Sequence, residues 1–225
     1  SKNKIEGGKS FITNSSLASI MMVYGQHSPA ISGIPSNNIS CVLLLKNEIN
    51  PMEIESNISE GSWGNVFFSN PLEVTDRLVG GLGKGFKVFS TTMLFERIGL
   101  AFFHLGLTKG ILKELEQTFK KTDLINSPHY QEAISTTLIV EAVCIRAINS
   151  LGTTKEEIVQ SSLAKVYSSD GLMKVSSLAM KLFTAHGKVN HRVAKLSNSS
   201  LLSTMYSGSK NLLQRNISAL SYDSI

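Results

Sequence analysis

The stretch Leu78-Val-Gly-Gly-Leu-Gly-Lys-Gly-Phe86 separates two parts of the sequence that have different hydrophobic periods. Before it, short apolar runs alternate with turn residues, a pattern typical of β-strands. After it, apolar residues recur every three or four positions, a pattern typical of packed helices. Because glycine tolerates backbone conformations that other residues avoid, the stretch predicts a hinge between a sheet and a helical region.

The same glycines have a second interpretation, a phosphate cradle at a helix N-terminus. The run lacks the Lys-Ser/Thr ending of a P-loop, and no parallel strand of a dinucleotide-binding fold precedes it. The hinge is therefore the preferred interpretation.

Four apolar runs before the hinge are predicted as strands, at 10–13, 19–24, 39–45 and 63–68. Between two of them, Pro29, Gly33 and Pro35 give residues 25–38 the composition of an exposed hairpin loop. We therefore expect residues 1–78 to form a partial antiparallel β-domain.

Helical periodicity after the hinge predicts helices at 85–119, 128–149 and 154–186, a fourth from about 190 and a last one at about 212–220. Lys120 and Lys121 are expected at the end of the first helix, where cations suit the helix dipole. Thr154 and Glu157 have capping-box spacing at the start of the third. The predicted fold class is α+β, with a four-helix bundle over residues 84–225.

The chain of 225 residues has a net charge of +5, which is spread along the sequence and argues against nucleic acid as a partner. Cys41 and Cys144 lie in apolar runs, which predicts buried, reduced thiols and a cytoplasmic location. No apolar run approaches the roughly 18 residues of a membrane span, and no signal segment is recognised. The five histidines include no pair at metal-ligand spacing, so no metal site is predicted.

Glu96 lies in the most apolar predicted helix, where a carboxylate without a role is costly to bury. Burial raises a carboxyl pKa toward neutrality, and this would make Glu96 a competent base for removing a proton from carbon. Two other interpretations stay open at this point: an ion pair with Arg97, and a glutamate that faces solvent.

Several stretches, in matching order and spacing, resemble the acyl-CoA dehydrogenase family across nearly all of residues 5–220. They are Gly8-Lys-Ser-Phe-Ile-Thr-Asn14, Leu78 to Phe86, Phe95-Glu-Arg-Ile98 with Gly106, Ala164-Lys-Val-Tyr167, and Tyr206-Ser-Gly-Ser209 through Gln214-Arg-Asn-Ile217. The resemblance implies a β-domain followed by a C-terminal helical bundle that drives oligomerisation. The family's N-terminal helical domain has no counterpart in this sequence.

The resemblance implies a FAD-dependent oxidoreductase that dehydrogenates an acyl thioester between its α and β carbons. Glu96 is implied as the base, because the isovaleryl and long-chain branch of the family carries its base in a Glu-Arg-Leu/Ile motif and a small residue at the position of Ser207. The implied cofactor contacts are Phe11, Thr13, Lys120, Gln131, Lys181 and Ser209. The implied substrate contacts are Arg97, Tyr206, Ser207 and Gly208.

The sequence departs from the family where the FAD diphosphate is held. The family's Arg-x-x-Phe-Gly segment falls on Lys120, Asp123 and Leu124, and a glycine pair falls on Thr184 and Ala185. A side chain at a glycine position removes the close backbone contact that an anion uses. The alternative function is therefore a degenerate structural or regulatory subunit that pairs with an active homologue, and a third is an enzyme for carrier-bound acyl groups.

Half a β-domain has open strand edges, which associate unless something covers them. We therefore expect a homo- or hetero-oligomer, or a further chain that supplies the missing N-terminal region.

Overall fold

The computed structural model describes residues 4–15, 17–27, 30–48, 50–54, 63–204 and 208–221. The chain divides into two compact units, Ser1–Thr92 and Met93–Ile225. The long helix α1 (Gly85–Thr118) contributes its first two turns to the first unit. Each unit has a hydrophobic core of its own, as expected of separate compact units.

The first unit holds two three-stranded antiparallel sheets. One has the order β1-β5-β4 and consists of β1 (Lys4–Thr13), β5 (Trp63–Glu73) and β4 (Asn50–Ile54). The other has the order β2-β3-β6 and consists of β2 (Ile20–Gln26), β3 (Ile39–Leu45) and β6 (Leu78–Val79). Because β2 and β3 pair without a register shift, the segment between them is the hairpin loop that the sequence predicts.

Alternate residues of the strands form one small core. Val23, Val42 and Leu44 of the β2-β3-β6 sheet are buried together with Val66 of β5 and Val74 just beyond it. Along β3 the intervening Leu43 and Leu45 are exposed. This alternation is the period of two that the apolar runs predict.

The glycine stretch packs closely against β3. The Oγ of Ser40 accepts a hydrogen bond from the amide of Gly83 at 2.8 Å and lies 2.8 Å from Nε2 of His27. A Cβ at Gly85 would lie only 2.4 Å from the carbonyl carbon of Ser40. Gly83 has a φ of 70°, in the left-handed region that favours glycine. The stretch therefore connects β6 to α1 while contacts with β3 hold it in place. The boundary between the two units lies further on, within α1, between Thr92 and Met93.

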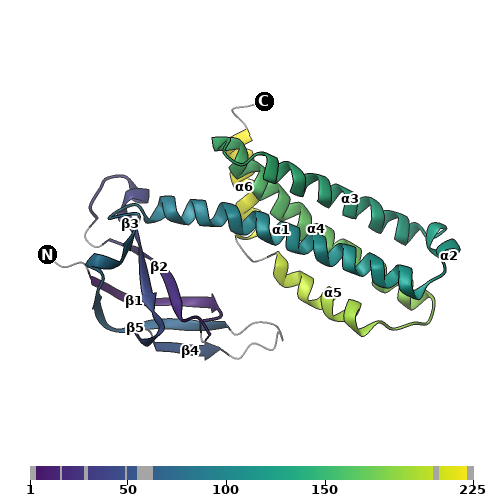
Figure 1. Ribbon diagram of the computed structural model, residues 1–225, viewed down its shortest axis with the longest axis horizontal. Helices are drawn as coiled ribbons and strands as arrows, with labels where there is room; N and C mark the ends of the chain where they lie inside the picture. Colours follow the sequence, from purple (N-terminus) through teal and green to yellow (C-terminus); the bar gives the residue numbers. More distant parts are fainter. Residues whose placement is uncertain are drawn as a thin grey trace. The chain divides into compact units, whose positions relative to one another are not determined.

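The second unit is helical (Figure 1). Its long helices are α1, α3 (Pro128–Asn149) and α4 (Thr154–Ala185). Its shorter helices are α2 (Lys121–Ile125), α5 (His191–Ser203) and α6 (Lys210–Ser221). α3 and α4 pack along each other, and both α5 and α6 pack on α4. The α+β class is thus confirmed, and α2 is a helix that the sequence analysis does not predict.

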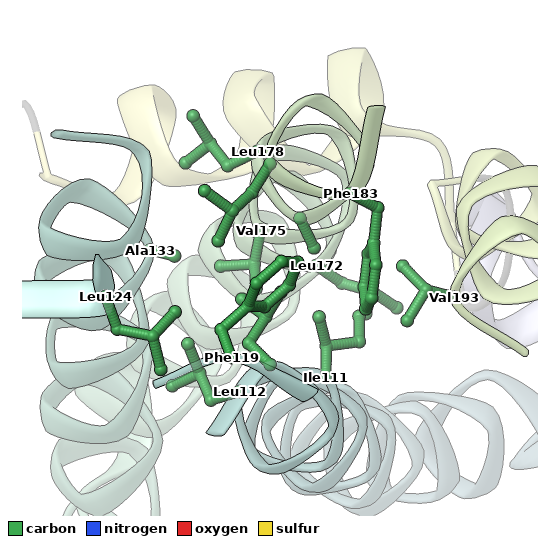
Figure 2. Packing of buried hydrophobic residues seen from close by; sticks show 13 residues of the cluster. Ile111, Leu112, Phe119, Leu124, Ala133, Leu172, Val175, Leu178, Phe183 and Val193 are labelled. Atoms are coloured by element: carbon green, nitrogen blue, oxygen red, sulfur yellow. The ribbon is translucent and has the colours of Figure 1, made fainter. Parts of the chain in front are cut away.

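Two apolar clusters fill the helical unit. In the larger, Phe119 and Phe183 lie with ring centroids 5.2 Å apart among side chains from α1 to α5 (Figure 2). In the smaller, Ile98 of α1 packs with Val140 and Cys144 of α3. Cys41 and Cys144 are both free and buried, as the sequence predicts. Across the described residues, no helix has both the length and the apolar character that crossing a membrane requires.

The end of α1 differs from the sequence-based expectation. Lys120 has extended backbone, with φ −67° and ψ 144°, and is the N-cap of α2, so the two lysines begin a helix rather than end one. The carbonyl of Thr118 accepts instead from Nζ of Lys188 at 3.0 Å. Lys188 also lies over the ring of Phe119, 4.7 Å from its centroid. A lysine distant in sequence therefore supplies the cation expected at this helix end.

The start of α4 also differs from the predicted capping box. Its N-cap is Thr153, which makes no side-chain capping bond, and the helix proper begins at Thr154. Glu157 still reaches back, but its Oε2 accepts from the amide of Gly152 at 2.8 Å. The tight turn before the helix, where Gly152 has a φ of 86°, brings that amide within reach.

Candidate functional site

The Glu-Arg-Ile motif lies on α1 within the helical unit. Glu96 is exposed, whereas Arg97 is half-buried, with Nη1 3.4 Å from the Oγ of Ser162 on α4. Burial lowers the pKa of Arg97, and the negative charge of Glu96 acts in the opposite direction. The motif therefore presents an accessible carboxylate beside a guanidinium that a buried serine holds.

The exposure of Glu96 differs from the desolvated position that the apolar helix suggests. The same part of α1 also leaves Phe95 and Phe103 about three-fifths exposed, at 58% and 61%. An apolar sequence therefore does not imply burial along this helix. Glu96 is therefore accessible to solvent, and its charge also acts on Arg97, so neither of the open interpretations excludes the other. Its catalytic role stays a prediction.

Lys165 on α4 is fully buried, with 0% of its surface exposed. Its Nζ donates to the carbonyl oxygens of Thr204 at 2.9 Å and Gly208 at 3.0 Å. Burial lowers the pKa of Lys165 to about 8, with a further decrease from the charge of Arg97 and an opposing effect from Asp170. Lys165 lies in one of the stretches that resemble the family, but no role for it follows from the sequence.

His104 on α1 lies close to this ammonium group. Its Nδ1 is 3.1 Å from the Oγ of Ser168, which in turn donates to the carbonyl of Lys165. Burial, followed by the charge of Lys165, lowers the pKa of His104 to about 4. A neutral imidazole and the buried hydroxyl group of Ser168 therefore form a polar contact between α1 and α4 close to Lys165.

The predicted substrate contacts at the end of the chain are described only in part. Tyr206 and Ser207 lie outside the described residues. Gly208 has a φ of 103° and its carbonyl contacts Lys165, as above. Ser209, a predicted cofactor contact, is exposed, and its Oγ accepts from the amide of Leu212 at 3.4 Å.

The other predicted cofactor contacts of the helical unit are exposed at its surface. Lys120 caps α2, and Gln131 on α3 donates from Nε2 to the carbonyl of Ile125 at 2.7 Å. Lys181 on α4 lies near enough to Glu132 that its charge helps to lower the pKa of that carboxyl. Gln131 therefore ties α2 to α3 in this chain.

Phe11 and Thr13 are placed by their backbone on β1 in the first unit. Their side chains lie outside the described part of the structure. Their predicted contact with a flavin stays a prediction.

The glycine hinge borders an open pocket of about 480 Å³ in the first unit. It is lined by Gly80, Lys84, Lys87, Val88, Thr91 and Thr92. The amide of Gly83, which a phosphate cradle would use, already donates to Ser40. The hinge interpretation therefore accounts for these glycines. Within the described residues, no three histidines, cysteines or carboxylates gather as a metal site would require.

The residues expected to hold the FAD diphosphate can balance its negative charge. They do not offer the backbone contacts that the family's glycine pair allows. Lys120 and Lys181 supply exposed ammonium groups. The exposed hydroxyl group of Ser209 is not beside Lys181, because the neighbouring Gly208 bonds Lys165, about four turns earlier on α4. Thr184 and Ala185 lie within α4, where backbone amides already serve the helix. Because Thr184 and Ala185 carry side chains in place of the glycine pair, side-chain cations would have to hold the diphosphate.

Comparison with known proteins identifies the chain. Residues 83–221 match the family model described as "Acyl-CoA dehydrogenase, C-terminal domain". This chain belongs to the acyl-CoA dehydrogenase family. No curated protein matches the sequence significantly.

Solved structures of acyl-CoA dehydrogenases have the same fold. An acyl-CoA dehydrogenase from Geobacillus kaustophilus is 18% identical with a TM-score of 0.81, covering 96% of this chain and 60% of its own. Butyryl-CoA dehydrogenase from Megasphaera elsdenii is 19% identical with a TM-score of 0.81, covering 96% and 59%. The prolyl acyl carrier protein oxidase AnaB is 15% identical with a TM-score of 0.83, covering 95% and 60%. The chain thus spans about three-fifths of the length of these proteins.

Proposed function

We propose that this acyl-CoA dehydrogenase family member takes part in the α,β-dehydrogenation of an acyl thioester, with Glu96 as the base. The observation that carries the proposal is the placement of Glu96 on α1, accessible and beside the guanidinium of Arg97. A carboxylate in that position can take the α-proton, which the thioester carbonyl makes acidic. FAD, when bound, supplies the acceptor for the hydride from the β carbon.

Arg97 and the lysines have supporting roles in this proposal. Because Ser162 holds the guanidinium, Arg97 is placed to orient Glu96 or an anionic part of the thioester. Lys120 and Lys181 would contact the FAD diphosphate as point charges. Both coenzyme A and carrier-bound thioesters fit the proposal, since the structural neighbours include a dehydrogenase named for butyryl-CoA and an oxidase named for an acyl carrier protein.

The visible absorbance spectrum of the purified, size-fractionated protein tests the proposal. We expect flavin bands, either as isolated or after added FAD and a second gel filtration, at about one equivalent per chain. Lys181→Ala should weaken FAD retention, whereas Lys174→Ala on the same helix should not, because Lys174 pairs with Glu132. A colourless protein that retains no added FAD would overturn the dehydrogenase proposal.

That colourless outcome would favour the second candidate, a flavin-free subunit that pairs with an active homologue. The side chains of Thr184 and Ala185, the last two residues of α4, support this candidate, because they stand where the family has the glycine pair that allows close backbone contact. Co-purification of flavin only with a second, homologous chain would then be expected.

Self-association is also part of the proposal. Four side chains on α3 form an apolar stripe that is about half exposed or more: Leu138, Ile139, Ile145 and Ile148. A stripe of this kind on a helix surface is typical of an interface rather than of a monomer. We propose that a second copy of the chain covers it, as expected for the bundle.

Sedimentation velocity tests this surface. Ile145→Lys should raise the dissociation constant more than about tenfold, since it removes buried apolar area and adds a charge. Gln117→Lys, at an exposed polar position of α1, is the matched control and should leave association unchanged. Association that Ile145→Lys leaves intact would place the interface elsewhere.

A further inference from the structure

Lys165 is the largest of the fully buried side chains in the described part of the chain. Lysine is almost never fully buried unless its charge is paired or hydrogen-bonded. Here the ammonium group donates to two backbone carbonyls, those of Thr204 and Gly208. Burying an ammonium group costs free energy, so a buried lysine held by two carbonyls is expected to have a specific role.

One of the two carbonyls follows the end of α5, and the other precedes the start of α6. Thr204 follows Ser203, the last residue of α5, and Gly208 lies two residues before Lys210, the first residue of α6. Carbonyls at a helix C-terminus lack intrahelical partners and attract cations. One ammonium group on α4 therefore joins the end of α5 to the approach of α6.

We propose that Lys165 is a positioning residue: its ammonium group holds the carbonyls of Thr204 and Gly208 together and thereby sets where the 208–209 segment lies. The inference rests on the proposed function only in one respect, namely that Gly208 contacts the substrate and Ser209 contacts FAD. The hydrogen-bonding role follows from the contacts themselves.

Helix α6 has other attachments to α4, so loss of the ammonium group should release the 208–209 segment without detaching the helix. Lys210 donates to Asp170 on α4 at 2.5 Å. Leu213 is fully buried, and its amide donates to the carbonyl of Ser209 at 3.1 Å. The first turn of α6 is therefore the place where release of the segment would be measured.

Burial and the charged groups around Lys165 together explain why its pKa is lowered. Arg97 and His104 face it from α1, Asp170 from α4, and Lys210 of α6 is paired with that aspartate. Because the pKa of Lys165 is about 8 in the folded chain and 10.5 in its ordinary state, the full cost of burying the ammonium is present below pH 8. That cost disappears as the pH rises from 8 to 10.5, so this group's contribution to stability increases over that range.

Hydrogen exchange of backbone amides tests the positioning role. In Lys165→Met, which keeps an unbranched side chain one atom shorter but removes every donor, we expect amides of residues 209–213 to exchange at least tenfold faster, with changes below twofold in α3. Lys165→Arg, which keeps charge and donors, should restore part of the protection. Lys174→Met, at an exposed position of the same helix, is the control. Unchanged protection of the Leu213 amide in Lys165→Met would overturn the proposal.

A measurement on the unaltered protein keeps the proposal testable if Lys165→Met does not fold. In a carbon NMR titration of the lysine Cε atoms, we expect Lys165 to titrate near pH 8, well below the exposed lysines. A Lys165 that titrates with the exposed lysines is not buried at these carbonyls, and the proposal falls.

Neither measurement needs flavin or substrate, so the two proposals fail separately. Release of the 208–209 segment in a protein that binds no FAD supports the role of Lys165 and contradicts the dehydrogenase. A protein that turns over, and whose Lys165→Met variant keeps both kcat and amide protection, supports the dehydrogenase and contradicts the role of Lys165.

Discussion

Glu96→Gln is expected to lower the turnover of an acyl thioester by about 10² to 10⁴-fold, the range that a positioned base contributes. Glutamine has nearly the shape of glutamate but cannot accept the α-proton. Because Glu96 is exposed on α1, the substitution should change the stability of the helical unit by less than about 1 kcal/mol. The measurement is kcat for the FAD-loaded protein with saturating thioester, together with exchange of the α-proton into deuterated water.

Two further variants make this result specific. Glu96→Asp keeps a carboxylate one methylene shorter and should retain part of the activity. Glu116→Gln removes the same charge elsewhere on α1, where the carboxylate accepts from the hydroxyl of Tyr130 at 2.7 Å, and should leave turnover within about threefold. Turnover by Glu96→Gln at the unaltered rate would show that another group takes the proton.

Gly85→Ala is expected to destabilise the first unit by about 3 kcal/mol, at the upper end of the usual cost of overpacking. The added Cβ would lie 2.4 Å from the carbonyl carbon of Ser40 and 2.7 Å from the amide nitrogen of Cys41. Both atoms belong to the backbone of β3, so no change of rotamer can relieve the contact. The free energy of unfolding, measured by urea denaturation, gives the size of the effect.

Gly33→Ala is the matched control in the same unit. Gly33 has no heavy atom within 4 Å of the position where a Cβ would lie, and its backbone is not in the left-handed region. The substitution should be neutral or stabilise by less than about 1 kcal/mol through the unfolded state. If Gly85→Ala behaved like this control, close packing of the hinge against β3 would be contradicted.

Helix boundaries were accessible from the sequence because their signals are local. Apolar spacing, Pro128 in a first turn and Gly152 after a helix place α3 at 128–149, and the structure has the same bounds. α2, β4 and β6 were missed, because elements of two to five residues have too few positions to show a period. β4 and β6 are strands by virtue of their pairing with β5 and β3.

The family and the α+β class could be predicted from the order and spacing of motifs, and the family model matches residues 83–221. Glu96 and Arg97 were also found by their motif. Their surroundings were not, because the exposure of Glu96 depends on which side of α1 the other helices cover. The sequence alone also suggested the wrong role for Lys120 and Lys121, since a cation after a helix can equally begin the next one.

Sequence by itself determined the hydrophobic periods and the glycine-rich connection, because each depends on residues that lie close together along the chain. It also determined the family, because the order and spacing of motifs can be seen without knowing which of them are in contact. Only the tertiary structure decided that Lys165 is buried and that Lys188 donates to the carbonyl at the C-terminal end of α1. Lys165 bonds carbonyls 39 and 43 positions later, and Lys188 bonds one 70 positions earlier. From its sequence neighbours alone, a lysine is predicted to lie at the surface. Its burial becomes possible only when the tertiary structure brings carbonyls from distant residues to the ammonium group and so offsets the free-energy cost of desolvation.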